Sequence, residues 1–319
     1  MGEWPRIGVV GATGAVGRVT LDLLRERGHE SVRAFASSRS AGTKLGELVV
    51  EQATPLALGA GDLDVCLFSV GTATSRELVP IAVEGGALCV DKSSAFRLQE
   101  GVPLIVPEVN GSRASDHFGI VANPNCCSIP LALVLAPLRD AAGLRTVRVA
   151  TYQSASGAGS QAMERLRGEQ VSEHDLRMDW SFDGVEFDEE AKIRAETRKI
   201  LELPDLPIGA TCVRVPVLVG HAEAVWIQTE EPLSAGEAER ILAEAPGLRL
   251  EPFPTPAKAA GGDEVLVGRV RADPADPDGL ALFLACDNLR KGAALNAIQI
   301  VELVLGAPQR SEIRLTGLR

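Results

Sequence analysis

Two adjacent cysteines, Cys126 and Cys127, follow an Asn-Pro-Asn turn in this chain. The apolar run CSIPLALVLAPL (127–138) comes next and predicts a helix that begins directly after the turn. A cysteine at a helix N-terminus has a lowered pKa, because the helix dipole and free N–H groups stabilise its thiolate. The alternative for Cys126 is a buried, unreactive thiol, and a polar turn is a poor place for one. We therefore predict that Cys126 is a nucleophile.

The segment RVPVLVGH (214–221) begins with Arg214 and ends with His221. Along one unbroken strand this odd spacing would place the two side chains on opposite faces. Pro216 and Gly220 can break the strand, so both side chains can still reach one cleft. An imidazole that titrates near neutrality suits acid–base catalysis, but a single histidine beside a strand is more often structural. The residues alone leave that choice open.

A glycine-rich turn near the N-terminus is a second place where chemistry is expected. Gly11, Gly14 and Gly17 follow a strand-like run and open a helical pattern. Glycines in such a turn permit close approach of a pyrophosphate to the helix N-terminus. The spacing is GxxGxxG rather than GxGxxG, and the alternative is a strand-to-helix turn without a ligand. The strand–turn–helix context favours a dinucleotide.

The segment that follows the second strand-like run indicates which dinucleotide binds. An NAD site usually has an Asp or Glu here, which holds the ribose 2′-hydroxyl. In this chain the segment is SSRSAG (37–42), which has no acid and carries Arg39 between serines. This chemistry suits a 2′-phosphate and predicts NADP, with a solvated surface arginine as the alternative.

The segment FDEEAKIRAETRKIL (187–201) has a helical pattern. Glu189 and Lys192, at positions i and i+3, share one face of this helix. Sequence alone favours a solvated helix with surface ion pairs. Arg97 ends the segment SSAFR (93–97). The residues alone do not decide whether it is a surface arginine or a ligand of an anion.

The elements that must position these residues change in character along the chain. In the first 125 residues, strand-like runs alternate with helical patterns at 17–28 and 75–86, which indicates βαβ units and a parallel sheet. These strand-like runs lie at 6–12, 31–37, 64–70, 87–93, 103–109 and 119–124. After residue 145, alternating strands with few helices predict a mixed or antiparallel sheet with one helix-covered face. Those strands lie at 145–153, 211–217, 223–230, 264–272 and 279–286, and a last helix is predicted at 290–306.

Composition narrows the class of protein. The 319 residues are 45% hydrophobic and carry a net charge of −11 with no basic run, which argues against a nucleic-acid partner. No run reaches 18 apolar residues and no signal-peptide pattern opens the chain, so we expect no membrane span and a cytoplasmic location. The six cysteines show no CxxC or Cys/His ligand spacing, so we expect no metal site.

Eight motifs, in order along nearly the whole chain, resemble those of the aspartate-β-semialdehyde dehydrogenases. They are GATGAVG, SSRSAG, DKSSAFR with VPLIVPEVN, NPNC, TYQSASGAG, EEAKIRAETRKIL, CVRVPVLVGH and DNLRKGAALNAIQ. The resemblance implies an α/β fold in which residues 1–125, with the C-terminal helix 290–306, form a doubly wound, Rossmann-like NADP domain. Residues 126–289 would form an α+β catalytic and dimerisation domain, and the protein would be a homodimer.

The same resemblance implies a role for each matching residue. Cys126 would be the nucleophile, His221 its acid–base partner, and Gln153 and Asn125 would orient the substrate acyl group. Glu189 would bind a substrate ammonium, Arg214 the substrate carboxylate, and Arg97 and Lys192 phosphate. NADP would be bound by Gly11, Thr13, Gly14, Ala15, Val16, Gly17, Ser37, Ser38, Arg39, Ser40, Ser69, Gly71, Ser156, Gly157 and Asn288.

The implied reaction is the NADPH-dependent reductive dephosphorylation of L-aspartyl 4-phosphate through a cysteine thioester. Two departures from the family pattern stand out. Thr72 replaces a common second glycine, and Cys127 stands where Ser or Thr is usual, which we interpret as a helix-start residue. The alternatives are a related acyl-phosphate reductase or semialdehyde dehydrogenase, for example one acting on N-acetyl-γ-glutamyl phosphate, and an NADP-binding pseudoenzyme.

Overall fold

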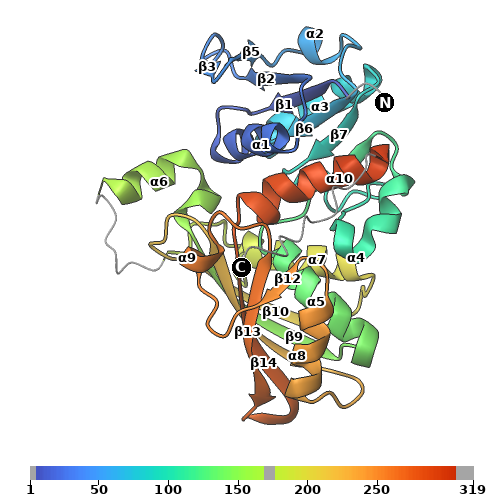
Figure 1. Cartoon of the computed structure of the whole chain (residues 1–319), viewed down its shortest axis with the longest axis vertical. Coiled ribbons are helices and arrows are strands. Elements are labelled where there is room, and N and C mark those ends of the chain that lie inside the picture. The colour runs from blue at the N-terminus through green and yellow to red at the C-terminus, as the bar shows by residue number, and fades with distance from the viewer. Residues whose placement is uncertain (1–4, 169–176, 307–319) are drawn as a thin grey trace, which may run out of the picture.

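The computed structural model describes residues 5–168 and 177–306. It contains two six-stranded sheets, one above the other in Figure 1, with the C-terminal helix α10 (Leu295–Leu305) between them. The predicted α/β class is confirmed. In the described residues, no helix combines the length and the apolar character needed to cross a membrane.

The first sheet is parallel throughout and has the order β5-β2-β1-β6-β7-β8. Its strands are β1 (Ile7–Val10), β2 (Val32–Ala36), β5 (Glu51–Gln52), β6 (Val65–Phe68), β7 (Leu88–Asp91) and β8 (Ile120–Ala122). From β1 the chain first builds outward through β2 and β5, then crosses back to β6 and builds in the other direction. The carboxyl ends of β1 and β6 therefore form a topological switch point, where ligands bind in open α/β sheets.

Helices cover both faces of this sheet, which explains why β1, β6 and β7 are buried along their whole length. Ile7 and Val9 pack with α1 (Ala15–Glu26) and α10, whereas Val10 and Phe68 belong to the core with α2 (Pro55–Leu58) and α3 (Thr72–Glu84). The helix α10 thus returns from the end of the described chain to the first sheet.

The second sheet is mixed, as predicted, with the order β10-β9-β11-β14-β13-β12. Its strands are β9 (Thr146–Gln153), β10 (Ile208–Arg214), β11 (His221–Gln228), β12 (Leu248–Leu250), β13 (Val265–Asp273) and β14 (Asp276–Cys286). The helices α5 (Ser128–Ala142), α7 (Asp188–Leu201) and α8 (Ala235–Glu244) share one apolar core with this sheet. On the other face Tyr152 and Trp226 are 38% and 37% exposed.

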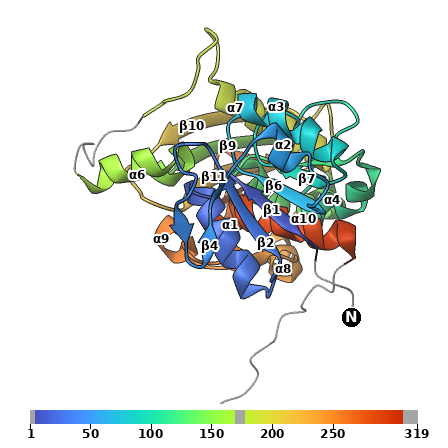
Figure 2. The same cartoon turned by 90° about the horizontal axis from the view of Figure 1, so that it is seen from above.

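Three predicted elements differ in the structure. The strand predicted at 211–217 is β10, which ends at Arg214, before Pro216. The run 103–109 forms no strand: only Leu104 bridges to Ala122, and α4 (Pro107–Asn110) begins at a proline, which cannot donate to a strand ladder. The predicted helix 290–306 begins with a π-helical turn (η3, Arg290–Ala294) before α10. Several smaller elements were not predicted from the sequence. They are β3 (Lys44–Leu45), β4 (Leu48–Val49), η1 (Gly111–Asp116), η2 (Ala155–Ala158), α9 (Pro256–Ala259) and α6 (Ser160–Arg167), which extends from the body in Figure 2.

Candidate active site

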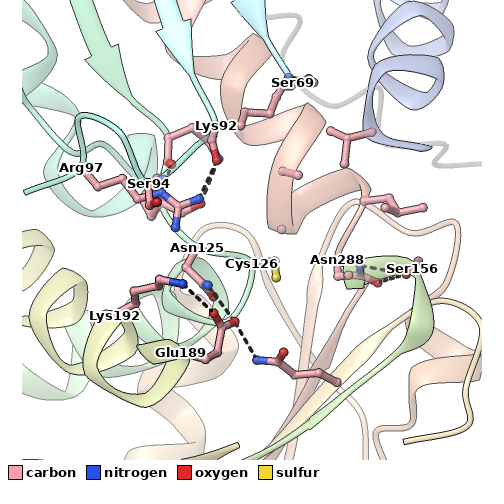
Figure 3. A pocket seen from close by; sticks show the side chains of 18 of the residues that line it. Ser69, Lys92, Ser94, Arg97, Asn125, Cys126, Ser156, Glu189, Lys192 and Asn288 are labelled. Carbon is pink, nitrogen blue, oxygen red and sulfur yellow. Dashed lines mark hydrogen bonds and ion pairs between the residues drawn. The ribbon is translucent and has the colours of Figure 1, made fainter. Parts of the chain in front are cut away.

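A pocket of about 410 Å³ lies where the carboxyl ends of the first sheet meet the second sheet (Figure 3). It brings together residues from segments that are distant in the sequence. Of the predicted site residues, its lining includes Val16, Ser69, Arg97, Asn125, Cys126, Gln153, Ser156, Gly157, Glu189, Lys192, Arg214 and Asn288.

The loop between β8 and α5 presents one of the two cysteines to this pocket. Cys126 is partly exposed, whereas Cys127 is fully buried and is the N-cap of α5, as a helix-start residue should be. Asn125 fixes the turn, because its Oδ1 accepts the Cys127 N–H at 2.7 Å. The helix begins at Ser128, so Cys126 lies just before the N-cap rather than in the first turn. Of the two thiols, it is Cys126 that a substrate can reach.

The surroundings of Cys126 favour its thiolate. The pKa of Cys126 lies well below its ordinary value because of a hydrogen bond with the Cys127 thiol and, next, the charges of His221 and Arg214. Burial raises the pKa of Cys127, and the neighbouring Cys126 raises it further. The two sulfur atoms and one ring nitrogen of His221 lie within 4.8 Å of one another. The pair therefore holds one thiolate at Cys126 and one thiol at Cys127.

His221 and Arg214 come from two strands rather than one. β10 ends at Arg214 and β11 begins at His221, so the segment 215–220 is the break that Pro216 and Gly220 predicted. The two side chains then approach the same residue. A Cβ added at Gly157 would lie 2.9 Å from Arg214 Nη1 and 3.1 Å from His221 Nε2. Arg214 and Gly157 line the pocket, and the fully buried His221 lies directly behind Gly157.

The Arg214 guanidinium is held on several sides. It donates to the Ser154 carbonyl at 3.0 Å and forms an ion pair with Asp179 at 3.2 Å. It also lies over the Trp180 ring, 4.7 Å from the ring centroid. Asp179 and Trp180 lie in an irregular segment with no motif, so sequence analysis missed them. Pinned in this way, Arg214 can present its charge to a carboxylate in a fixed direction.

Glu189 is not on a solvated face. It is 6% exposed and accepts hydrogen bonds from Asn125 Nδ2 at 2.9 Å and Gln153 Nε2 at 3.2 Å. Burial raises its pKa. Lys192 lies beside it, 3.8 Å from Glu189 Oε2 (Figure 3). Lys192 is also paired with Asp188 at 2.8 Å. The alternative of a wholly solvated helix is wrong.

Arg97 is also buried, so the alternative of a surface arginine is wrong. Its Nη1 donates to Glu196 Oε1 at 2.8 Å and its Nε to the Asn123 carbonyl at 3.0 Å. The second oxygen of Glu196 accepts the Asn125 N–H at 2.6 Å. One buried carboxylate thus joins the predicted phosphate cation to the loop that carries Cys126.

The glycine turn is shaped mainly by packing. Gly11 has φ +87°, and a Cβ there would lie 2.3 Å from the Ser69 carbonyl; a Cβ at Gly17 would lie 2.2 Å from the Gly11 carbonyl. Gly14 is the N-cap of α1 and supplies no capping side chain. The first-turn N–H groups of a helix that starts in this way can bind a phosphate, so the residues fit a dinucleotide. Thr13, Ala15 and Val16 belong to the same turn and the start of α1.

Other predicted cofactor residues lie outside the pocket lining. Ser37, Ser38 and Arg39 are exposed after β2, with Ser40 half-buried, and Arg39 has no ion pair within the described residues. Gly71 is the exposed N-cap of α3. Next to it Thr72, one of the departures, bonds Ser94 over 3.0 Å.

Asn288 and Ser156 form a buried, hydrogen-bonded link in the wall of the pocket. Asn288 Oδ1 accepts from Ser156 Oγ at 3.0 Å, Ser154 Oγ at 3.1 Å and the Gly220 N–H at 2.8 Å. The amide therefore ties η2 to the turn before His221. A role in cofactor binding remains a prediction for both residues.

Sequence analysis also missed Glu223. This residue is fully buried on β11, and neither carboxylate oxygen has a conventional partner among the described residues. Burial raises its pKa well above the ordinary value, and the nearby Cys126 charge adds to the effect. Strand alternation was the available signal, because residues 221 and 223 must point to the same face.

Comparison with known proteins agrees with this geometry. The family model described as the NAD binding domain of semialdehyde dehydrogenase matches residues 6–117. The family model described as its dimerisation domain matches residues 135–183 and 179–291. The aspartate-semialdehyde dehydrogenase of Streptomyces akiyoshiensis is 44% identical, over 94% of this chain and 98% of that protein. The chain belongs to the aspartate-semialdehyde dehydrogenase family.

Other members of the aspartate-semialdehyde dehydrogenase family extend the match. The Bacillus subtilis enzyme is 39% identical over 95% of this chain and 98% of its own. A crystal structure of Vibrio cholerae aspartate semialdehyde dehydrogenase II, complexed with ASA, has a TM-score of 0.91 at 35% identity and covers 96% of this chain and 99% of that one. The resemblance inferred from the motifs is confirmed, and the domain that binds a nicotinamide dinucleotide is the one built on the first sheet.

Proposed function

We propose that the protein is an NADP-dependent, phosphorylating aspartate-semialdehyde dehydrogenase. In the biosynthetic direction it would convert L-aspartyl 4-phosphate to L-aspartate 4-semialdehyde and phosphate. The observation that carries the proposal is the set of charges around one accessible thiol. Glu189, Arg214 and the pair Arg97 and Lys192 line the pocket that holds Cys126.

These charges match the substrate group by group. Aspartate semialdehyde carries an ammonium and a carboxylate, and its oxidation to the acyl phosphate also requires phosphate. Buried polar groups need partners once water is excluded. Glu189 would accept the ammonium, Arg214 the carboxylate, and Arg97 with Lys192 the phosphate. Asn125 and Gln153, which both donate to Glu189, would orient the acyl group beside Cys126.

Cys126 would attack the acyl carbon of the acyl phosphate and form a thioester as the carbon–oxygen bond to phosphate breaks. The bound nicotinamide supplies the hydride that reduces this thioester. His221 would then give a proton to the thiohemiacetal oxygen and take it back as the carbon–sulfur bond breaks. That cleavage frees the aldehyde and restores the Cys126 thiolate for the next turnover.

Two alternatives are disfavoured by particular residues. An N-acetylated substrate has no ammonium, so buried Glu189 would face it unpaired. A pseudoenzyme that only binds cofactor would not require a thiol with a lowered pKa beside an imidazole. We propose NADP rather than NAD because Arg39 follows β2 where an acid would otherwise hold the ribose. A cytoplasmic homodimer, formed through residues 126–289, completes the proposal, and residues 1–125 with helix 290–306 would form the cofactor domain.

A steady-state assay tests the proposed function. Reduction of NADP⁺ is followed with L-aspartate 4-semialdehyde, N-acetyl-glutamate semialdehyde and succinic semialdehyde, each with and without phosphate. We expect phosphate-dependent turnover, fastest with the aspartate compound, and none for Cys126→Ala. Preference for the N-acetylated aldehyde, or equal rates without phosphate, would contradict the proposal.

A further inference from the structure

Lys92 follows β7 and lines the pocket above Cys126 (Figure 3). Its Nζ donates to Ser69 Oγ at 2.8 Å and to Thr20 Oγ1 at 3.3 Å. Both partners are neutral hydroxyls. The neighbouring Asp91 forms no hydrogen bond with the ammonium; its two oxygens accept from Ser75 and Ser93 instead.

The other cations of the pocket lining are already paired. Arg97 pairs with Glu196, Lys192 with Asp188, and Arg214 with Asp179. Within the parts of the chain that the structure describes, Lys92 forms no ion pair. A half-buried lysine that bonds only hydroxyls lacks a directly bonded counter-charge, and the Asp91 charge acts on it without an ion pair. An anionic ligand would supply that bonded counter-charge.

The position of Nζ indicates which anion. Thr20 belongs to α1 and lies one turn after Val16, whose carbonyl accepts the Thr20 hydroxyl at 2.8 Å. The Ser69 carbonyl lies where a Cβ on Gly11 would have to sit. The ammonium is therefore next to the glycine turn and the first turns of α1. Under the proposed function, Arg97 and Lys192 would bind the substrate phosphate instead.

On the basis of the proposed function, we propose that Lys92 is a ligand of the phosphate groups of the nicotinamide dinucleotide and that it takes up a proton when the cofactor binds. Burial lowers the pKa of Lys92 to about 7, although the Asp91 charge acts in the opposite direction. An adjacent phosphate raises that pKa again, since it stabilises the ammonium. Arg97, whose Nη2 donates to the Lys92 carbonyl, keeps its charge throughout. Above pH 7, cofactor binding is then linked to protonation of this one amine.

Calorimetric titration with NADP⁺ at pH 8, in Tris and in HEPES, measures the proton uptake and the Kd of the full-length protein. An amine with a pKa of about 7 is roughly nine-tenths neutral at that pH. We therefore expect the wild type to take up more than about half a proton per site. Lys92→Met should abolish the uptake and raise the Kd about tenfold or more, which is the loss of one charge-assisted contact.

Lys92→Arg separates charge from titration. It should keep the Kd within about threefold while abolishing the uptake, because an arginine is always charged. Lys258→Met, which alters an exposed lysine paired with Glu251, is the control and should behave as the wild type. Uptake that persists in both Lys92 variants would overturn the proposal. So would an unchanged Kd with a raised KM for phosphate in Lys92→Met, since the lysine would then serve the substrate. Normal uptake without semialdehyde turnover would contradict only the proposed function.

Discussion

The imidazole Nδ1 of His221 accepts a hydrogen bond from the backbone N–H of Ser154 over 3.0 Å. A backbone N–H can only donate, so Nδ1 keeps its lone pair and the neutral ring carries its hydrogen on Nε2. Nε2 has no protein partner among the described residues. The absence of a side chain at Gly157 leaves room in front of it, since a Cβ there would lie 3.1 Å away. His221 can therefore present an N–H to Cys126 and to the acyl oxygen.

Replacing His221 tests this role. His221→Ala should lower kcat by about 10²–10⁴-fold, the usual effect of losing an acid–base group. It should also move the pH profile of Cys126 alkylation upward, because a hydrogen bond with His221 is one of the influences that lower the pKa of that thiol. The iodoacetamide rate is measured from pH 5 to 10, with His117→Ala as the control. An unshifted profile would show that the imidazole does not act on the thiol.

We predict that the substrate specificity depends on Glu189. Glu189→Ala should raise KM for L-aspartate 4-semialdehyde by about tenfold or more, the contribution of a charge-assisted contact. The KM for succinic semialdehyde, which lacks the ammonium, should change little. Lys192→Ala should instead raise the apparent KM for phosphate. Glu244→Ala, on the exposed side of α8, is the control. If Glu189→Ala leaves both aldehydes unaffected, the case for an amino-bearing substrate fails.

We predict that Arg39 determines the preference for NADP over NAD. One charge-assisted contact to the 2′-phosphate contributes about 1.5–3 kcal/mol, or roughly ten- to more than a hundred-fold in affinity. Arg39→Ala should reduce kcat/KM for NADP by that order and leave kcat/KM for NAD unchanged. Arg249→Ala, an exposed arginine paired with Glu264, serves as the matched control. If Arg39→Ala still prefers NADP to the same degree, residues other than Arg39 determine the preference.

Glu223 makes the stability of the protein depend on pH. Its folded pKa is raised, by burial first and then by the Cys126 charge. The folded state therefore holds a proton that the unfolded chain releases above its ordinary pKa, and this contribution to stability is lost as pH rises through the folded pKa. Glu223→Gln cannot titrate, so its stability relative to wild type should increase between pH 5 and pH 8. Urea unfolding measures the difference, and two parallel curves would contradict the prediction.

Local patterns predicted the elements that carry the site. The strand–glycine–helix pattern predicted β1 and α1, and the Asn-Pro-Asn turn predicted the start of α5. Pro216 and Gly220 correctly indicated a break between β10 and β11, because each disrupts a strand ladder for a backbone reason. The strand predicted at 103–109 is wrong, because the apolar residues of this run are buried without pairing along a strand.

Contacts between residues that are distant in the sequence could not be predicted from local patterns. Glu196 is 99 residues from Arg97 and 71 from Asn125, and a carboxylate on a charged helix has no local feature that reveals a buried partner. The same is true of Lys92, whose hydroxyl partners Thr20 and Ser69 come from different elements. The burial of Glu189 depends on the approach of Asn125 and Gln153, which only the folded chain provides.

The two cysteines have separate predicted roles. Cys126→Ala should lower kcat by about 10⁴-fold or more, because the nucleophile is lost. Cys127→Ser should keep most of the activity, since a hydroxyl can still donate to the Cys126 thiolate and accept from Gln153 Nε2, which lies 3.0 Å from the Cys127 sulfur. Steady-state kinetics of both variants provides the comparison. If Cys127→Ser abolishes turnover, the assignment of the nucleophile is wrong.

The most direct test of the mechanism is to trap the acyl-enzyme. The protein is mixed with L-aspartate 4-semialdehyde and NADP⁺ in the absence of phosphate, quenched in acid, digested and mapped by mass spectrometry. We predict a burst of about one NADPH per active site, as expected for a covalent intermediate, and one aspartyl group on Cys126 that is lost when phosphate is added before the quench. An aspartyl group on Cys127, or phosphate-dependent turnover with no modified cysteine, would contradict the account.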